Sequence, residues 1–159
     1  MPAATEAAPS PGAAATTPPR VPRPTLQGLV EWETARGVER SNTRAYVSGA
    51  RSALRMMWFL DFISALINGL LDNPTAELAE CTRKAYTAAL EHRHTWIVRT
   101  AIGSAMYFLP TRTAFLASLG SGRPTEELEP SLREFVVLVE RVRKELWAYY
   151  AAHGITDLP

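Results

Sequence analysis

The sequence predicts an all-α protein, and three observations lead to this class. From Thr25 onward, apolar residues recur at intervals of three and four, which is the spacing of an amphipathic helix and not the alternation of a half-buried strand. The periodic segments are separated by Gly and Pro, which tend to end helices. The chain has 159 residues, 47% of them apolar, which is enough for a single domain with one core.

The first two helices are expected over 25–37 and 41–71. Thr25 is a favourable N-cap, and Gly37 is a favourable stop. Gly49, inside the second helix, costs about 1 kcal/mol relative to Ala and is a candidate for a bend. Apolar residues cover most of the circumference of this helix, so we expect it to be central and buried on two sides. They are Met56, Met57, Trp58, Phe59, Leu60, Phe62, Ile63, Leu66, Ile67, Leu70 and Leu71.

Four further helices are expected in the rest of the chain. The third begins at Thr75, and a fourth continues or restarts it until Pro110. A short fifth helix lies between Pro110 and Gly120, and the last runs from Pro130 to His153. The third helix carries its apolar residues along one face, and these are Leu78, Cys81, Ala85, Tyr86 and Leu90. The last helix buries Leu132, Phe135, Val136, Val139, Val142, Leu146 and Tyr149 and exposes Glu134, Arg141, Lys144 and Glu145.

Two parts of the chain differ in composition. Residues 1–24 are mainly Ala, Pro and Thr with few large apolar side chains, so we expect a disordered leader there and the folded domain over 25–159. The leader lacks the apolar centre of a secretory signal; a flexible tail is favoured over an organelle transit peptide. The apolar run Met56–Leu71 is shorter than the roughly 20 residues that span a bilayer, which predicts a chain without a membrane span.

Charge and composition argue against several functions. The formal net charge of +1 offers no general field for nucleic acid, so recognition of an anion must rest on locally placed arginines. The single Cys81 cannot form an internal disulfide and fits a reducing, cytoplasmic compartment. His92 and His94 do not face each other on a helix, so zinc is not expected. With no recognisable catalytic motif either, the sequence predicts no enzyme and no cofactor.

Arg51 and Arg55 are the candidate recognition residues. Four residues apart on a helix, their side chains leave one face about one turn apart and can converge on a single anion. Two guanidinium groups suit a cluster of phosphate oxygens, because each can donate two parallel hydrogen bonds. The alternative is a pair of solvated surface arginines, either alone or in ion pairs with Glu31, Glu33 or Glu39. Spacing alone favours this alternative.

Several motifs along the chain resemble those of the glycolipid transfer protein family, in its ceramide-1-phosphate transfer branch. The motifs are RxxxR within GARSALRMMWFL, AYxxxLxxxHxW within AYTAALEHRHTWIVR, and LPTRxxFL within YFLPTRTAFLASL, in this order, followed by the tail GITDLP. The resemblance implies a two-layer, all-helical protein that is not an enzyme. Such a protein takes a sphingolipid from one membrane, shelters its chains in an apolar cavity and delivers it to another membrane.

The resemblance also implies roles for individual residues. Arg55 stands where glycolipid-binding relatives have a Trp, and with Arg51 it matches the phosphate-binding pair of the ceramide-1-phosphate branch. His94 matches the histidine that hydrogen-bonds the amide of ceramide. Trp96 matches an aromatic residue that docks on the bilayer in some members, and Arg99 is a further candidate charge. Members of the family begin with two more helices, which carry an Asp and a Lys or Asn of the site, and residues 1–24 contain neither such a helix nor an Asp.

These expectations lead to three hypotheses. The preferred one is a cytoplasmic carrier or sensor that binds ceramide-1-phosphate and visits membrane surfaces transiently. The second is a protein of the same fold that lacks the two N-terminal helices, no longer holds lipid and instead binds a protein partner through its exposed apolar surface. The third is a preference for glycolipids. No nucleic-acid partner is expected under any of them.

Overall fold

The computed structural model describes residues 25–158 and confirms the all-α class. Within these residues there are six α-helices, two short 3₁₀ turns and no strand, apart from an isolated bridge between Asn42 and Val47. The predicted leader, residues 1–24, lies outside the described residues, so the domain boundary stays a prediction. The elements are α1 (Leu26–Arg36), α2 (Gly49–Asp72), α3 (Leu78–Ala89), η1 (Glu91–Arg93), α4 (Trp96–Ala105), η2 (Met106–Phe108), α5 (Arg112–Leu119) and α6 (Thr125–Ala152).

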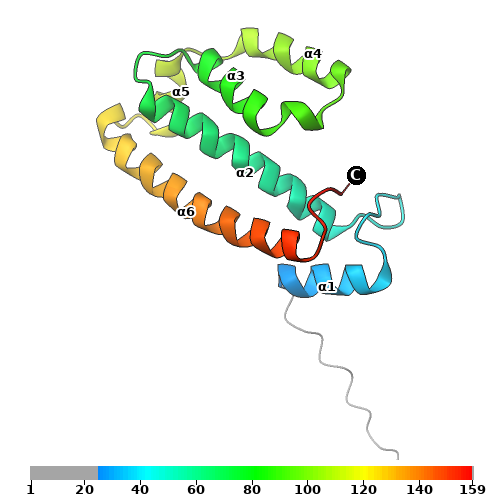
Figure 1. The fold of residues 1–159 in the computed structure, drawn as a ribbon. Helices are drawn as coiled ribbons and strands as arrows, with labels where there is room; N and C mark the ends of the chain where they lie inside the picture. The colour runs from blue at the N-terminus through cyan, green and yellow to red at the C-terminus, as the bar shows by residue number, and fades with distance from the viewer. Residues whose placement is uncertain (1–24, 159) are drawn as a thin grey trace, which may run out of the picture.

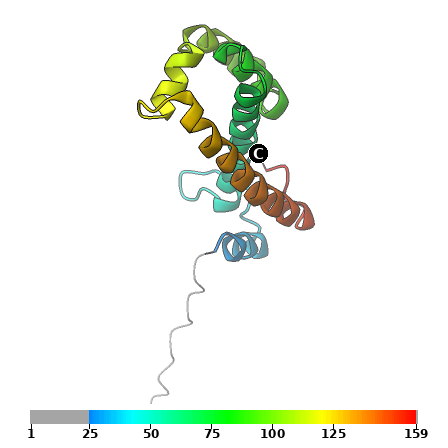
Figure 2. The same ribbon diagram turned by 90° about the vertical axis from the view of Figure 1, so that its left-hand side faces the viewer.

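Helix α2 is the centre of the fold, as the sequence predicts, but it is less completely buried than predicted, because Met56 and Phe59 are exposed. It packs against α3 on one side and α6 on the other, and α1 crosses near its N-terminal end (Figure 1). Helix α4 lies beyond α3, on the side away from α6 (Figure 1). Figure 2 shows α5 at the far end of α2, where it joins the layer of α3 and α4 to the start of α6. The chain therefore forms two layers that share α2.

The first helix agrees with the prediction, whereas the second begins later than predicted. The side chain of Thr25 accepts a hydrogen bond from the amide of Gly28, and Gly37 closes α1 with a φ of 65°. Residues 41–48 form a loop and are not helical, because Ser48 is the N-cap of α2 and accepts a hydrogen bond from the amide of Arg51. Gly49 is thus the first residue of α2 and not a bend within it.

Gly49 has a packing role at the start of α2. Leu29 of α1 occupies the space that a β-carbon at Gly49 would fill. A β-carbon at this position would displace the end of the Leu29 side chain. The glycine therefore lets Leu29 pack directly against the first turn of the central helix.

The later helices show two differences in their starting points. Helix α3 begins at Leu78, three residues after the predicted Thr75. Helix α6 begins at Thr125, so Pro130 lies inside it and is not its first residue. Glu126 and Glu127 in the first turn favour a helix N-terminus there, which offsets the one hydrogen bond that Pro130 cannot donate.

The buried stripe of α6 is narrower than predicted. Val136 and Val139 are buried, but Phe135 is 39% exposed and Val142 is 48% exposed, and the neighbouring Leu138 is exposed as well. The predicted polar residues Glu134, Arg141, Lys144 and Glu145 are all exposed. One face of α6 thus leaves apolar side chains in contact with water within the described part of the chain.

Two core clusters lie at opposite ends of α2. The first joins α1, the start of α2, the end of α6 and the C-terminal tail through Val30, Ala50, Leu54, Met57, Tyr150, Ile155 and Leu158. In this cluster the hydroxyl of Tyr150 donates to the carbonyl of Ala50 at 2.9 Å. The second joins the end of α2 to α3 through Leu66, Leu70, Leu78, Cys81 and Ala85. The single cysteine is therefore a core residue.

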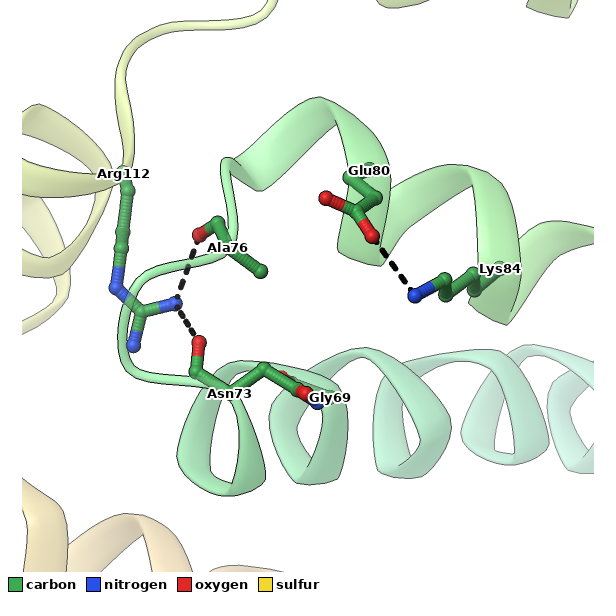
Figure 3. Close-up of polar contacts among 6 residues, drawn as sticks. All are labelled: Gly69, Asn73, Ala76, Glu80, Lys84 and Arg112. Carbon is green, nitrogen blue, oxygen red and sulfur yellow. Dashed lines mark hydrogen bonds and ion pairs between the residues drawn. The ribbon is translucent and has the colours of Figure 1, made fainter.

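Arg112 closes the C-terminal end of α2. One terminal nitrogen of its guanidinium donates to the carbonyl of Leu70 at 2.6 Å, and the other donates to the carbonyls of Asn73 and Ala76, both at 3.2 Å. Figure 3 shows the side chain of Arg112 reaching into the turn between α2 and α3. The last carbonyls of a helix have no partner within the helix, so this arginine of the LPTR motif satisfies groups that would otherwise need water.

Helix α2 is also long and strongly apolar. With 24 residues and a mean hydropathy of 1.4 in its most apolar window, it is long and apolar enough to cross a membrane. The sequence prediction of no membrane span rested on the shorter run Met56–Leu71 within this helix. A single helix of this kind is a weak indication, because the core helix of a globular protein has the same composition. The packing of α2 between α3 and α6 buries 33% of this window.

Candidate functional site

A buried carboxylate anchors the N-terminus of α2. Glu33 of α1 is fully buried and accepts hydrogen bonds from the hydroxyls of Tyr46 and Ser48 and from the amides of Gly49 and Ala50. Burial alone would raise the pKa of Glu33, but these hydrogen bonds together lower it below its ordinary value. An ionised carboxylate at this point also interacts favourably with the helix dipole. The first turn of α2 is therefore held in place from α1.

Arg51 and Arg55 leave this anchored end of α2. Arg51 is only 7% exposed, whereas Arg55 is exposed. The pKa of Arg51 is lowered, first by burial and second by the positive charge of Arg55. The two cations are thus close enough to influence each other electrostatically. Among residues 25–158, Arg55 forms no ion pair with Glu31, Glu33 or Glu39. The burial of Arg51 departs from the surface alternative, whereas the exposure of Arg55 fits it.

A hollow of about 380 Å³ opens beside Arg55. We call it the basic hollow, and it is lined by Arg55, Trp58, His92, Arg93, Asp157 and Leu158. The guanidinium carbon of Arg93 lies 4.2 Å from the centre of the Trp58 ring, which is a cation–π contact between η1 and α2. Sequence reasoning missed this pair, because a stack between residues of distant segments leaves no local pattern.

His94 lies just past η1 and is held by Tyr86 of α3. The tyrosine hydroxyl is 3.0 Å from Nδ1 of the histidine, and the two rings are tilted against each other with centres 5.7 Å apart. A hydroxyl that donates to Nδ1 leaves the proton of a neutral imidazole on Nε2, which can then donate to a carbonyl. His94 does not line the basic hollow, but it follows His92 and Arg93, which do.

An apolar hollow is lined in part by Tyr86. It measures about 180 Å³ and is lined by Phe62, Thr82, Tyr86, Ile102, Ala105, Met106 and Leu109. Pockets for drug-sized ligands are usually about 300–1,000 Å³, so this hollow is too small for two lipid chains as it stands. Tyr86 lines it and also contacts His94, so one residue connects a polar group to an apolar space.

Helix α4 and η2 carry large apolar side chains on their surface. Trp96 is 68% exposed, Tyr107 is 84% exposed and Phe108 is 88% exposed. Every residue of α4 except Ile102 is exposed. Arg99 lies on this helix and lines a different hollow from Arg55, together with Arg83 and Glu91. Aromatic side chains of this kind suit the boundary between membrane and water.

The chain is similar to proteins of known family and structure. The model of the family described as "Glycolipid transfer protein (GLTP)" matches residues 13–121. The ceramide-1-phosphate transfer protein of Rattus norvegicus is 32% identical over 139 residues, which are 84% of this chain and 64% of that protein. The corresponding protein of Homo sapiens is 31% identical over 137 residues, with the same coverage. The chain thus spans less than two thirds of these relatives.

Solved structures resemble the fold as well. The human ceramide-1-phosphate transfer protein in complex with 12:0 ceramide-1-phosphate superposes with a TM-score of 0.76 at 30% identity, over 85% of this chain and 66% of that one. A mutant of Arabidopsis accelerated-cell-death 11, complexed with C12 ceramide-1-phosphate, gives a TM-score of 0.75 at 20% identity, over 82% of this chain and 63% of that one. The second likeness concerns the fold alone.

Proposed function

This chain belongs to the glycolipid transfer protein family, and on that premise we propose that it binds ceramide-1-phosphate and carries it between membranes without chemical change. The arginine pair at the anchored end of α2 carries the proposal. Arg51 and Arg55 lie close enough to influence each other electrostatically, and Arg55 opens onto the basic hollow. Similarity to ceramide-1-phosphate transfer proteins of several animals supports the same choice of lipid.

In this proposal two sets of groups recognise the polar part of the lipid. The guanidinium groups of Arg51 and Arg55 hold the phosphate through charge-assisted hydrogen bonds, each contributing about 1.5–3 kcal/mol. His94 donates from Nε2 to the amide carbonyl, with its Nδ1 occupied by Tyr86. The phosphate contacts select the headgroup, and the histidine contact selects the sphingoid backbone. No cofactor takes part.

The acyl chains require an apolar space, because exposing them to water costs about 0.8 kcal/mol per methylene group. Ile102 of α4 and Met106 of η2 form one wall of the apolar hollow. Since the remaining residues of α4 are exposed, this helix can move outward without disrupting either core cluster. Outward movement of α4 would enlarge the hollow to admit the chains.

The exposed aromatic side chains of α4 and η2 supply the membrane contact in this proposal. Trp96, Tyr107 and Phe108 insert at the interface, and Arg99 is attracted to anionic lipid on the same side. A carrier of this kind works in the cytoplasm and visits membranes transiently. The same helix would thus form a wall of the apolar hollow and the docking surface.

The second candidate function is a helical interaction protein that does not carry lipid. The apolar face of α6 favours it, because Phe135, Leu138 and Val142 are exposed together with Met56 and Phe59 of α2. Exposed apolar residues in such number are typical of a surface that binds another protein. This protein would co-purify with a protein partner and without sphingolipid.

Vesicle transfer tests the proposal. Donor vesicles with fluorescent ceramide-1-phosphate are mixed with acceptor vesicles, and transfer by the wild type is compared with that by Arg55→Glu. Arg141→Glu, which makes the same charge change at an exposed site on α6, is the control. We expect transfer by the wild type and the control and at least a tenfold loss in Arg55→Glu. Absence of transfer by the wild type would contradict the proposal, and transfer of glucosylceramide that is independent of Arg55 would indicate a glycolipid carrier.

A further inference from the structure

We infer that Arg93 and Trp58 complete an anion site with Arg55 in the basic hollow and that this site takes a phosphate monoester. The inference rests on the proposed function, because the anion is the headgroup of the same lipid. It adds two residues to the site, Trp58 from α2 and Arg93 from η1. The source of the phosphate, lipid or free, is distinguished by the experiment below.

The geometry places two cations on one hollow. Trp58 follows Arg55 by three residues on α2, so the two side chains lie on neighbouring parts of one helix face. Arg93 is brought over the Trp58 ring from η1, with 4.2 Å between the guanidinium carbon and the ring centre. A stacked guanidinium has lost much of its rotational freedom, so it can bind an anion at a smaller entropic cost.

The hydrogen bonding of the hollow is incomplete. Nε of Arg93 and Nε1 of Trp58 are both buried and have no hydrogen-bond partner among residues 25–158. Arg93 also forms no ion pair within this described part of the chain. Buried donors are normally paired, so two unpaired donors on one wall indicate a missing acceptor. A ligand rich in acceptor oxygens satisfies this wall after a small shift of either side chain.

The charges favour a phosphate monoester over a diester. Arg55 of α2 and Arg93 of η1 both line the hollow, and Arg51 is close enough to Arg55 to interact with it electrostatically. A monoester carries up to two negative charges and three terminal oxygens at neutral pH, whereas a diester has one charge and two such oxygens. Asp157 also lines the hollow, and its carboxylate opposes the binding of any anion. Removal of this carboxylate is therefore expected to strengthen binding.

A purely structural role of the stack makes different predictions. If Arg93 only held η1 against α2, its replacement would lower the stability of the fold and weaken the binding of all ligands to the same extent. If Arg93 binds the anion, its replacement weakens the binding of ligands that carry a phosphate. The binding of ceramide, which has no phosphate, then stays unchanged. Asp157 separates the two roles further, because only an anion site gains affinity when this carboxylate is lost.

The test measures binding of inorganic phosphate, 2:0 ceramide-1-phosphate and 2:0 ceramide by calorimetry. The proteins are the wild type, Arg93→Gln, Asp157→Asn and the exposed control Arg141→Gln, each checked for its melting temperature. We expect about a tenfold weaker affinity for both phosphate ligands in Arg93→Gln, a several-fold gain in Asp157→Asn, and no change in the control. The Nε–H signal of Arg93 in ¹⁵N NMR spectra should shift on titration with either phosphate ligand.

Each other outcome decides a separate point. Lipid binding that depends on Arg55 but not on Arg93 would overturn this inference and leave the proposed function standing. Binding of inorganic phosphate that depends on Arg93, with 2:0 ceramide-1-phosphate bound no more tightly than inorganic phosphate, would support the anion site. It would contradict the proposed lipid carrier. An equal loss of ceramide and ceramide-1-phosphate binding in Arg93→Gln would assign the stack a structural role. Absence of binding of any ligand by the wild type would overturn both proposals.

Discussion

The carboxylate of Glu33 accepts a hydrogen bond from the amide of Ala50 at 2.9 Å, which joins α1 to the first turn of α2. Ser48 donates to the same carboxylate oxygen at 2.8 Å and also caps the helix. The next residue after Ala50 is Arg51, which is proposed to bind the phosphate. The turn that Glu33 anchors is therefore the turn that carries this arginine. The interaction thus links the stability of the fold to the position of the candidate site.

Replacement of Glu33 should destabilise the protein. Glu33→Gln keeps the size of the side chain, but it removes the charge and places an amide donor against donors of α2. Loss of charge-assisted hydrogen bonds and an unpaired buried group together cost about 3 kcal/mol. Urea unfolding should show this loss, and Glu31→Gln, an exposed neighbour, should change the free energy of unfolding by less than about 0.5 kcal/mol.

The same carboxylate predicts the pH dependence of stability. Its pKa is lowered in the folded protein, so the unfolded chain binds a proton more readily than the folded one as pH falls. The stabilisation is therefore complete above the ordinary pKa of glutamate, which is about 4.3, and is lost as pH falls through the lower folded value. The free energies of unfolding of the wild type and of Glu33→Gln, measured between pH 7 and pH 2, should converge at the acid end. A constant difference would contradict the hydrogen-bonded, ionised state of Glu33.

Arg112 should contribute more to stability than an ordinary surface arginine. Its guanidinium donates to the carbonyls of Leu70, Asn73 and Ala76, which close the end of α2. Arg112→Ala leaves these carbonyls to water or unpaired, and we expect a loss of about 2 kcal/mol. The control is Arg133→Ala. Within the described residues, the only ion pair of Arg133 is an exposed one with Glu129 on the same helix. Removal of this ion pair should lower the free energy of unfolding by less than about 0.5 kcal/mol. Equal effects of the two replacements would contradict the capping role.

The sequence predicted features that depend on local spacing and missed those that depend on distant residues. The six helices follow from periodicity along single segments, whereas the convergence of Arg51 and Arg55 on one anion stays a prediction. The start of α2 does not follow from periodicity, because the acceptor that fixes it, Glu33, comes from another helix. The same reason explains the missed stack of Arg93 on Trp58. In both places a tertiary contact decides what local preference leaves open.

The aromatic residues of α4 and η2 should control membrane binding without affecting stability. Trp96 and Phe108 are mostly exposed, so their replacement creates no cavity in the fold. Trp96→Ala and Phe108→Ala should each reduce binding to phosphatidylcholine vesicles several-fold in a sedimentation assay, with an unchanged melting temperature. Trp32→Ala is the control, since Trp32 is 45% exposed but belongs to α1, away from this helix. An equal reduction in the control would show that binding is not confined to α4 and η2.

Tyr86 should determine the tautomer of His94. Its hydroxyl lies 3.0 Å from Nδ1, and in the proposed function it donates there and leaves the histidine proton on Nε2. Tyr86→Phe removes this donor but keeps the ring that lines the apolar hollow. We expect a loss of about 1 kcal/mol in binding of 2:0 ceramide-1-phosphate, with no change in binding of inorganic phosphate. ¹⁵N NMR of the imidazole should show the Nε2–H tautomer in the wild type and a mixture in the variant; an Nδ1–H tautomer in the wild type would contradict the assigned direction of this hydrogen bond.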